Sequence, residues 1–476
     1  MRKLTRRSFL KHAGIGGVFL LSSASPFRLV EDVFSEEIRE VSLTAAVTPV
    51  DIGTGRTFMA WTYNGTAPGP EIRVKEGDTL RVTLRNNLPE GTTIHWHGLP
   101  VPNRMDGVPD VTQDPVQTGA SFIYEFEATP PGTYVYHSHA SYQLDRGLYG
   151  ALIIEPKQEE RSYDREYTLL LDDWATVDGG GPEASRQGRV RSGMGTGMMG
   201  SGQQDPEAPL LEPLYDEYTI NGKVFRASPP FTVKRGERVR LRIINPSAAT
   251  LYTLRIAGHS LTVTHTDGRP VVPFTVDALR VGMGERYDAE LTANNPGRWY
   301  IYTLRDGSPA GGRQLGSLVY QGITATSFNN DTLSRFRVSE YRLFDGVEET
   351  YVMPVSTIDR AFRMTLSGGV MSPYWTINGK VYPDTDTLSV IPGESVRFEY
   401  SNLSMASHPM HLHGHFFEVA GSGLSTGIRI RKDTLIIPSM GSGAIEFVAD
   451  NPGDWLHHCH NLYHHAGGMA NVMKVA

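Results

Sequence analysis

The stretch 63–88, YNGTAPGPEIRVKEGDTLRVTLRNNL, decides the fold class of this chain. An Asn-Gly turn signal leads into a strand of alternating apolar and polar residues, then a glycine turn with an acidic residue, then a second alternating strand. The same order returns in INGKVFRASPPFTVKRGERVRLRIINPS at 220–247 and in INGKVYPDTDTLSVIPGESVRFEYSNLS at 377–404. Such regular short strands predict an all-β chain made of β-sandwiches in series.

A second repeated segment closes each sandwich: PGTYVYHSH at 131–139, PGRWYIYTL at 296–304 and PGDWLHHCH at 452–460. Together the two repeats predict three units at 40–157, 158–325 and 326–476. The stretch 179–209 has no periodicity and is rich in glycine. We expect it to form an exposed, mobile excursion of the middle unit.

The N-terminus and the overall charge narrow the function classes. Residues 1–30 contain a twin-arginine pair, Arg6-Arg7, ahead of a short apolar run, which predicts an export signal rather than a membrane span. We therefore expect a periplasmic or extracellular protein with no membrane span. A formal charge of −7 gives no electrostatic case for binding nucleic acid. We expect a monomer, and an oligomer stays an open alternative.

Histidine pairs occupy matched places in the outer units. In the first unit they are His95 with His97 and His137 with His139; in the third they are His411 with His413 and His458 with His460. The middle unit has Arg255-Ile256-Ala257 and Tyr302-Thr303-Leu304 at these places. A single pair could be two half-exposed surface histidines, but four pairs at matched positions of the repeat indicate one shared role.

Metal binding explains the four histidine pairs. Residues i and i+2 of a strand face the same side, so each pair presents two imidazoles in parallel. Eight clustered imidazoles would repel one another on protonation, whereas neutral imidazole is a common ligand of transition metals. We therefore expect a metal cluster between the first and third units, which requires the chain to bring these units together. The middle unit would then act as a spacer and a wall of the substrate site.

Cys459 is the only cysteine of the chain, so it cannot form an intramolecular disulfide. It is either an inert buried thiol or a metal ligand. His408 precedes the pair His411 and His413 by three residues, His464 follows Cys459 by five, and Met469 follows it by ten. Two imidazoles, one thiolate and a weak thioether are the ligands of a blue-copper site. Because neighbours on a strand face opposite sides, His458 and His460 would serve the separate cluster.

The motifs HWHG, HSH, HPMHLHGH and HCHNLYHHAGGM closely resemble those of the multicopper oxidases, over about residues 45 to 476. The resemblance is greatest to bacterial copper-resistance oxidases and three-domain laccases. It implies three consecutive cupredoxin-like Greek-key β-sandwich domains and four coppers per chain. It assigns His408, Cys459, His464 and axial Met469 to type 1 copper, and His95 and His411 to type 2. The type 3 pair receives His97, His137, His139, His413, His458 and His460.

The same resemblance implies a laccase-like oxidase that takes single electrons at type 1 and reduces O₂ to water at the trinuclear cluster. Phenols, aromatic amines and metal ions such as Cu(I) are the expected donors. Asp106 lies where relatives carry a carboxylate that assists proton delivery, although an aspartate before Gly107 would also suit a turn. Several bacterial relatives have a carboxylate directly after the last type 1 histidine, where this chain has His465.

Other interpretations stay open at this stage. Met194, Met198 and Met199 lie in the glycine-rich stretch and could bind Cu(I) transiently, or belong to a plain linker. The alternative function is a periplasmic copper-binding protein that protects against copper and whose main chemistry is cuprous oxidation. A copper nitrite reductase would not need the type 3 histidines. His259, His265, His415 and His457 have no expected role as ligands.

Overall fold

The computed structural model describes residues 37–476 apart from 177–208, 306–307, 330, 332, 334, 348–356, 370–371 and 422–428. The predicted export signal and the methionines at 194, 198 and 199 fall outside the described residues. Among the described residues, no helix has the length and hydropathy needed to cross a bilayer.

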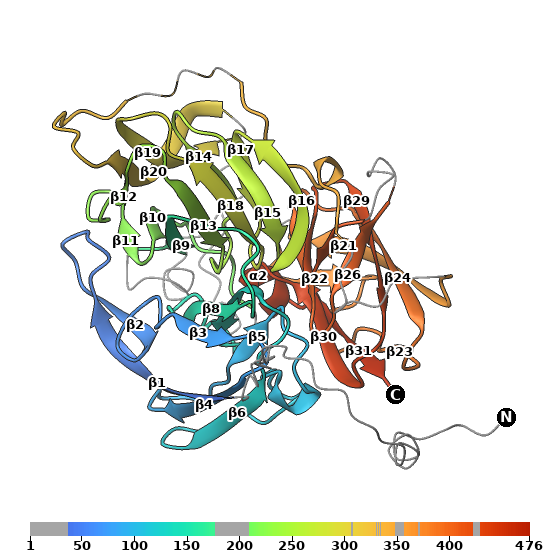
Figure 1. Ribbon diagram of the computed structural model, residues 1–476. Helices are drawn as coiled ribbons and strands as arrows, with labels where there is room; N and C mark the ends of the chain where they lie inside the picture. The colour runs from blue at the N-terminus through green and yellow to red at the C-terminus, as the bar shows by residue number, and fades with distance from the viewer. Residues whose placement is uncertain are drawn as a thin grey trace, which may run out of the picture. The chain divides into compact units, whose positions relative to one another are not determined.

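Each of the three units contributes two sheets, and the prediction of an all-β chain is confirmed (Figure 1). In the first unit the sheet orders are β2-β1-β4-β6 and β3-β8-β7-β5. Its strands are β1 (Ile38–Val50), β2 (Phe58–Tyr63), β3 (Ile72–Lys75), β4 (Thr79–Asn86), β5 (His95–His97), β6 (Ser121–Glu127), β7 (Gly132–His137) and β8 (Tyr149–Glu155). A 3₁₀ turn, η2 (Asn103–Met105), follows β5.

The middle unit has the sheet orders β11-β10-β9-β13-β18-β15-β16 and β12-β20-β19-β14-β17. Its strands are β9 (Arg165–Trp174), β10 (Glu217–Ile220), β11 (Lys223–Val224), β12 (Phe231–Val233), β13 (Arg238–Ile244), β14 (Tyr252–Ile256), β15 (Leu261–Thr266), β16 (Arg269–Val276), β17 (Ala278–Val281), β18 (Arg286–Thr292), β19 (Arg298–Arg305) and β20 (Ser308–Tyr320). The turn η3 (Tyr341–Leu343) follows them.

The third unit has the sheet orders β22-β21-β24-β29-β26-β27 and β23-β31-β30-β25-β28. Its elements are β21 (Arg360–Gly368), β22 (Trp375–Ile377), β23 (Leu388–Val390), β24 (Ser395–Asn402), β25 (His408–Leu412), β26 (Phe417–Ala420), β27 (Arg431–Lys432), β28 (Thr434–Ile437), β29 (Ser442–Val448), β30 (Gly453–Cys459), helix α2 (Leu462–Ala466) and β31 (Ala470–Val475).

The sequence repeat is also a topological repeat. The opening strand of each unit pairs in parallel with a later one, as β1 with β4, β9 with β13, and β21 with β24. In the second sheet of each unit the parallel pairs are β3 with β8, β12 with β20, and β23 with β31. Parallel neighbours need long crossover connections, so the same crossovers occur three times.

The Asn-Gly turns are built alike in all three units. Asn64, Asn221 and Asn378 have φ of 54°, 53° and 54°, and a positive-φ glycine follows each one, as a type I′ hairpin turn requires. Each asparagine side chain also ties its turn to the opening strand. It accepts a hydrogen bond from one backbone N–H there and donates to a carbonyl two residues earlier.

The apolar core is continuous between two of the three units. The second and third units share one continuous cluster of buried side chains, which extends from Leu169 to Val475. The first unit has its own cluster, which Phe416 of the third unit enters. Burial of apolar area on this scale is the main stabilising contribution to such a fold.

Candidate metal centre

Eight histidine side chains from four segments meet between the first and third units. In the first unit β5 carries His95 and His97, and β7 ends at His137. These two strands pair so that His95 lies opposite His137. In the third unit β25 and β30 pair so that His411 lies opposite His458. His413 and His460 directly follow the ends of β25 and β30, and His139 lies two residues after the end of β7.

The imidazoles of the two units contact one another directly. Ring centroids of His97 and His411 are 3.7 Å apart, and those of His95 and His413 are 3.9 Å apart. All eight side chains are buried; His139, at 9% exposure, is the most exposed of them. A buried polar group without a partner is costly, so this arrangement needs a compensating interaction.

Hydrogen bonds fix which ring nitrogen faces the centre of the cluster. Nδ1 of His95 donates to the Asp106 carbonyl, and Nδ1 of His411 donates to the Asp433 carbonyl, both at 2.8 Å. Nδ1 of His137 and of His458 donate to nearby carbonyls in the same way. This leaves Nε2 unprotonated on each ring, with its lone pair available to a metal.

Several ring nitrogens of the cluster have no hydrogen-bond partner among the described residues, and are therefore available to a metal. They include Nε2 of His95, His137 and His411, Nδ1 of His97, and both ring nitrogens of His460. Nε2 of His458 faces Nε2 of His413 at 3.1 Å and Nε2 of His139 at 3.3 Å. Converging acceptors repel one another unless a cation lies between them, so the donor set fits copper, for which imidazole is a suitable ligand.

The ligand atoms fall into overlapping groups, and within each group they lie within 4.8 Å of one another. One group holds His95, His97 and His411, and another holds His97, His137 and His460. A third holds His139, His458 and His465, with His413 also facing His458. Each group mixes residues from the first and third units.

Two carboxylates support the cluster. Asp106, which is fully buried, accepts a hydrogen bond from Nδ1 of His413 at 2.9 Å, and its Oδ1 lies 3.1 Å from Nδ1 of His95. Asp433 accepts from Nε2 of His97 at 3.1 Å. Burial alone would raise the pKa of Asp433, but the Arg286 guanidinium and the neighbouring imidazoles hold this pKa well below its usual range.

A second cluster forms around Cys459. The Nδ1 atoms of His408 and His464 are 3.0 Å apart, and they lie 3.6 and 3.5 Å from the Cys459 Sγ. Met469 is fully buried. Its backbone N–H donates a hydrogen bond to the carbonyl of His464, and its carbonyl accepts one from the backbone N–H of Cys459, both at 3.0 Å. Nε2 of His408 donates to the Ser404 hydroxyl at 2.7 Å, which leaves its Nδ1 free to bind metal. The predicted type 1 residues therefore lie together.

Helix α2 sets the position of His464. Asn461 caps the helix by accepting hydrogen bonds from the backbone N–H groups of Tyr463 and His464. Asn-type caps satisfy N–H groups that no helical carbonyl can reach. Cys459 on β30 is flanked by His458 and His460, which belong to the larger cluster. The two clusters are thus joined through adjacent residues of one strand.

Burial keeps these imidazoles neutral. It lowers the pKa of His408 to about 3, and burial followed by repulsion from His95 lowers the pKa of His137 to about 3. Burial also raises the pKa of the Cys459 thiol. Metal binding would have to displace the thiol proton, as it does when a thiolate coordinates a metal.

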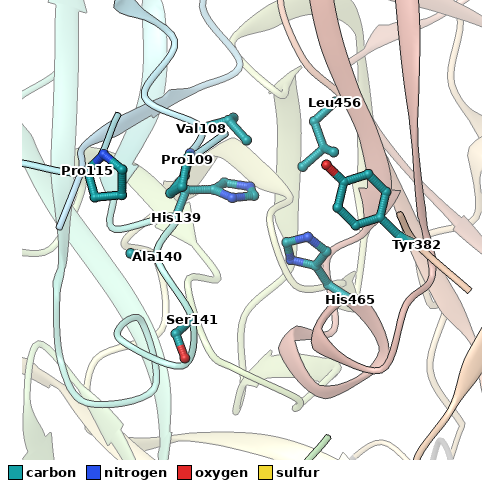
Figure 2. A pocket seen from close by; sticks show the side chains of 9 residues that line it. All are labelled: Val108, Pro109, Pro115, His139, Ala140, Ser141, Tyr382, Leu456 and His465. Carbon is teal, nitrogen blue, oxygen red and sulfur yellow. The ribbon is translucent and has the colours of Figure 1, made fainter. Parts of the chain in front are cut away.

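A cavity of about 270 Å³ leads toward the larger cluster. Figure 2 shows His139 on one side of it, facing His465 and Tyr382 across the opening. The His465 ring is 4.5 Å from that of His458 and 5.1 Å from that of His139. His465 therefore stands between the cavity and the buried ligands, with its pKa lowered to about 4 by burial.

The other histidines have ordinary structural partners. His259 and His415 occupy equivalent places beside Trp299 and Trp455. His457 bonds Tyr400 and Asn471, and His265 lies 3.8 Å from Asp288. None of these four is a member of a cluster of candidate ligands among the described residues.

The histidine motifs do not point to several residues that support the site. Asp433, Arg286 and Ser404 lie outside every histidine motif, and Asp433 is separated from Arg286 by 147 residues. The alignment of the repeats could have indicated Ser404, because Asn402 and Ser404 match Asn245 and Ser247 in the middle unit. Asn402 and Asn245 accept hydrogen bonds from these serines in the same way.

Comparison with known proteins gives one consistent result. Three family models, each described as multicopper oxidase, match residues 45–159, 165–323 and 357–476. Multicopper oxidase MmcO of Mycobacterium tuberculosis is 36% identical, over 98% of this chain and 96% of its own length. Copper resistance protein A of Escherichia coli is 26% identical, over 99% of both chains. The crystal structure of laccase from Botrytis aclada is 26% identical, with a TM-score of 0.73 over 93% of this chain and 88% of its own.

Proposed function

Since this chain belongs to the multicopper oxidase family, an oxidoreductase family that uses copper and O₂, we propose that it is a laccase-like oxidase with four coppers per chain. Its fold of three consecutive cupredoxin-like β-sandwiches is that of the family. The observation that carries the proposal is the convergence, on one buried place, of ring nitrogens from the first and third units that have no hydrogen-bond partner. A storage site would not need this division into two clusters.

In this proposal His408, Cys459, His464 and Met469 hold type 1 copper, and His95 and His411 hold type 2. The type 3 pair is held by His97, His137 and His460 on one side and by His139, His413 and His458 on the other. When bound, the coppers would supply the redox chemistry that passes four electrons, with four protons, to O₂ and yields two molecules of water.

The protein groups around the cluster position ligands and provide for protons. Asp106 holds His95 and His413 in the tautomer that leaves Nε2 free. The same carboxylate is the candidate for delivering protons, because it contacts ligands from both units. His465 is the second candidate, since it faces the cavity that leads to His139 and occupies the place of a carboxylate in several relatives.

The donor and the cellular location belong to the proposal as well. The similarity to proteins named laccases supports phenolic or aromatic compounds as electron donors of this chain. The similarity to proteins named copper resistance proteins supports a role in handling copper. We propose single-electron oxidation of such donors or of Cu(I), after export to the periplasm or beyond by the twin-arginine route. The second candidate is a copper-protection protein whose main reaction is the oxidation of Cu(I).

Oxygen uptake distinguishes these functions. The copper-loaded protein is supplied with a phenol and, separately, with Cu(I), and the steady-state rates are compared beside a metal analysis. A laccase-like oxidase consumes O₂ with the phenol, whereas a copper-protection protein consumes it with Cu(I) alone. The Cys459→Ser variant should lose the blue absorption and the turnover while it remains folded. If this variant stays blue, or if loaded protein holds far fewer than four coppers, the proposal is wrong.

A further inference from the structure

Trp375, the first residue of β22, covers both histidines of the Cys459 cluster. Its ring centroid lies 3.8 Å from that of His464 with the planes tilted by 34°, and 5.3 Å from that of His408 in an edge-on contact. His464 is 4% exposed and His408 is fully buried, whereas Trp375 is only partly buried. The indole is therefore a partly exposed side chain in contact with both imidazoles.

The surroundings hold the indole in this position. The backbone N–H of Trp375 donates to the carbonyl of Gly467, just after helix α2, at 2.8 Å, which fixes the main chain that carries the indole. A Cβ on Gly467 would lie 2.7 Å from Cδ1 of the indole, and a Cβ on Gly369 would collide with the opposite edge of the ring. Only glycine leaves room for the ring at these two places, so the fold accommodates a large aromatic side chain against His464.

The residues at the equivalent place in the other two units show which contacts of Trp375 are shared and which belong to the third unit alone. Counting back from each Asn-Gly turn, Trp375 matches Trp61 in the first unit and Tyr218 in the middle unit. An aromatic residue therefore serves packing in all three units. The contacts differ, however: Trp61 lies under the guanidinium of Arg146 at 4.7 Å, and Tyr218 lies under that of Arg313 at 4.8 Å. Among the three, Trp375 is the one that contacts candidate metal ligands.

We propose that electrons enter the protein through Trp375, and this inference rests on the proposed function of the Cys459 cluster as type 1 site. A donor docks against the exposed part of the indole, loses one electron and is oxidised by one unit. The electron crosses the 3.8 Å ring contact to His464 and reduces the type 1 copper by one unit. The indole ends unchanged, and no bond or proton is exchanged within the protein. The competing route is direct transfer to the small exposed part of His464.

The test measures the reduction of type 1 copper without turnover. Anaerobic stopped-flow mixing follows the loss of the blue absorption with hydroquinone and with ferrocyanide as donors. The variants are Trp375→Leu and Trp375→Phe, with Trp61→Phe as the matched control from the first unit. The reduction potential and the absorption spectrum of each variant are measured separately, so that a changed driving force is recognised.

We expect the leucine variant to lose its blue colour about tenfold more slowly with both donors, at an unchanged potential. Phenylalanine, which keeps a smaller ring, should slow the reaction less, and Trp61→Phe should match the wild type. The proposal is overturned if the leucine variant reacts as fast as the wild type or faster, because electrons then enter at His464 directly. If the leucine variant does not fold, an unchanged rate in the phenylalanine variant overturns it equally. A wild-type protein without blue absorption would instead refute the proposed function.

Discussion

At the scale of single residues, Asp106 does two things with different atoms. Its backbone carbonyl accepts the Nδ1 proton of His95, and its carboxylate accepts that of His413. One residue thus sets the tautomers of a proposed type 2 ligand and a proposed type 3 ligand from different units. Such supporting hydrogen bonds raise ligand basicity and hold ring orientation.

Substitution of Asp106 separates its structural contribution from its part in proton transfer. In Asp106→Asn the amide oxygen can still accept from His413, so we expect full copper content but about 10–100-fold slower O₂ uptake, because the carboxylate is lost. In Asp106→Ala, His413 loses its acceptor, and we expect copper to be lost as well. Copper analysis beside oxygen uptake makes the comparison. An asparagine variant as fast as the wild type would leave Asp106 with a positioning role alone.

At the scale of elements, most of the fold could be predicted because it depends on local patterns. The alternating strands and the Asn-Gly turns are determined within a few residues, and the histidine pairs follow from the two-residue period of a strand. Helix α2 was not predicted, since five residues give too short a pattern and its cap, Asn461, stands within a metal motif. The partners of Asp433 could not be predicted either, because they meet through packing of distant strands.

The half-buried acid Asp145, which lies beside helix α2, gives a prediction about pH. Asp145 accepts hydrogen bonds from Tyr463 of α2 at 2.6 Å and from Tyr215 at 3.0 Å. Burial, followed by repulsion from Asp173, raises the Asp145 pKa from 3.8 to about 7. In this range the unfolded chain releases the proton and the native protein keeps it. The native state therefore loses stability through Asp145 as pH rises from about 4 to about 7.

Asp145→Asn removes this loss, because an amide has no proton to release. We expect the stability advantage of the variant over the wild type to grow by about 1–3 kcal/mol between pH 5 and pH 8. Urea unfolding of the metal-free proteins at the two pH values measures it. Asp216→Asn serves as the control, because it makes the same substitution at another partly buried aspartate, directly before β10. An advantage that is the same at both pH values would mean that Asp145 titrates normally.

At the scale of the whole molecule, the middle unit does more than separate the other two. It holds none of the proposed ligands, yet its Arg286 forms two 2.7 Å bonds with both carboxylate oxygens of Asp433 in the third unit. Arg286 also donates to the carbonyl of Thr133 in the first unit. Beside it, Lys432 of the third unit pairs with Asp267 and Glu285 of the middle unit, both at 3.0 Å. A buried ionic network thus links all three units next to the proposed type 2 ligands.

Arg286→Met should therefore damage both stability and the cluster, since it leaves the Asp433 carboxylate buried and unpaired. Removing one partner of a buried ion pair typically costs about 3–5 kcal/mol, and urea unfolding of the metal-free protein measures this loss. Copper at the type 2 and type 3 positions should fall too. Asp433 orients His411, a proposed type 2 ligand, through its carbonyl, and His97, a proposed type 3 ligand, through its carboxylate. The double variant with Asp433→Asn removes the unpaired charge. Compared with Arg286→Met alone, the double variant should recover much of the stability but less of the copper. The neutral amide at this position would orient His97 less well than the carboxylate that Arg286 holds in the wild type. Equal recovery of both would mean that the network stabilises the fold without tuning the metal site, and the middle unit would then be the spacer that the sequence predicts.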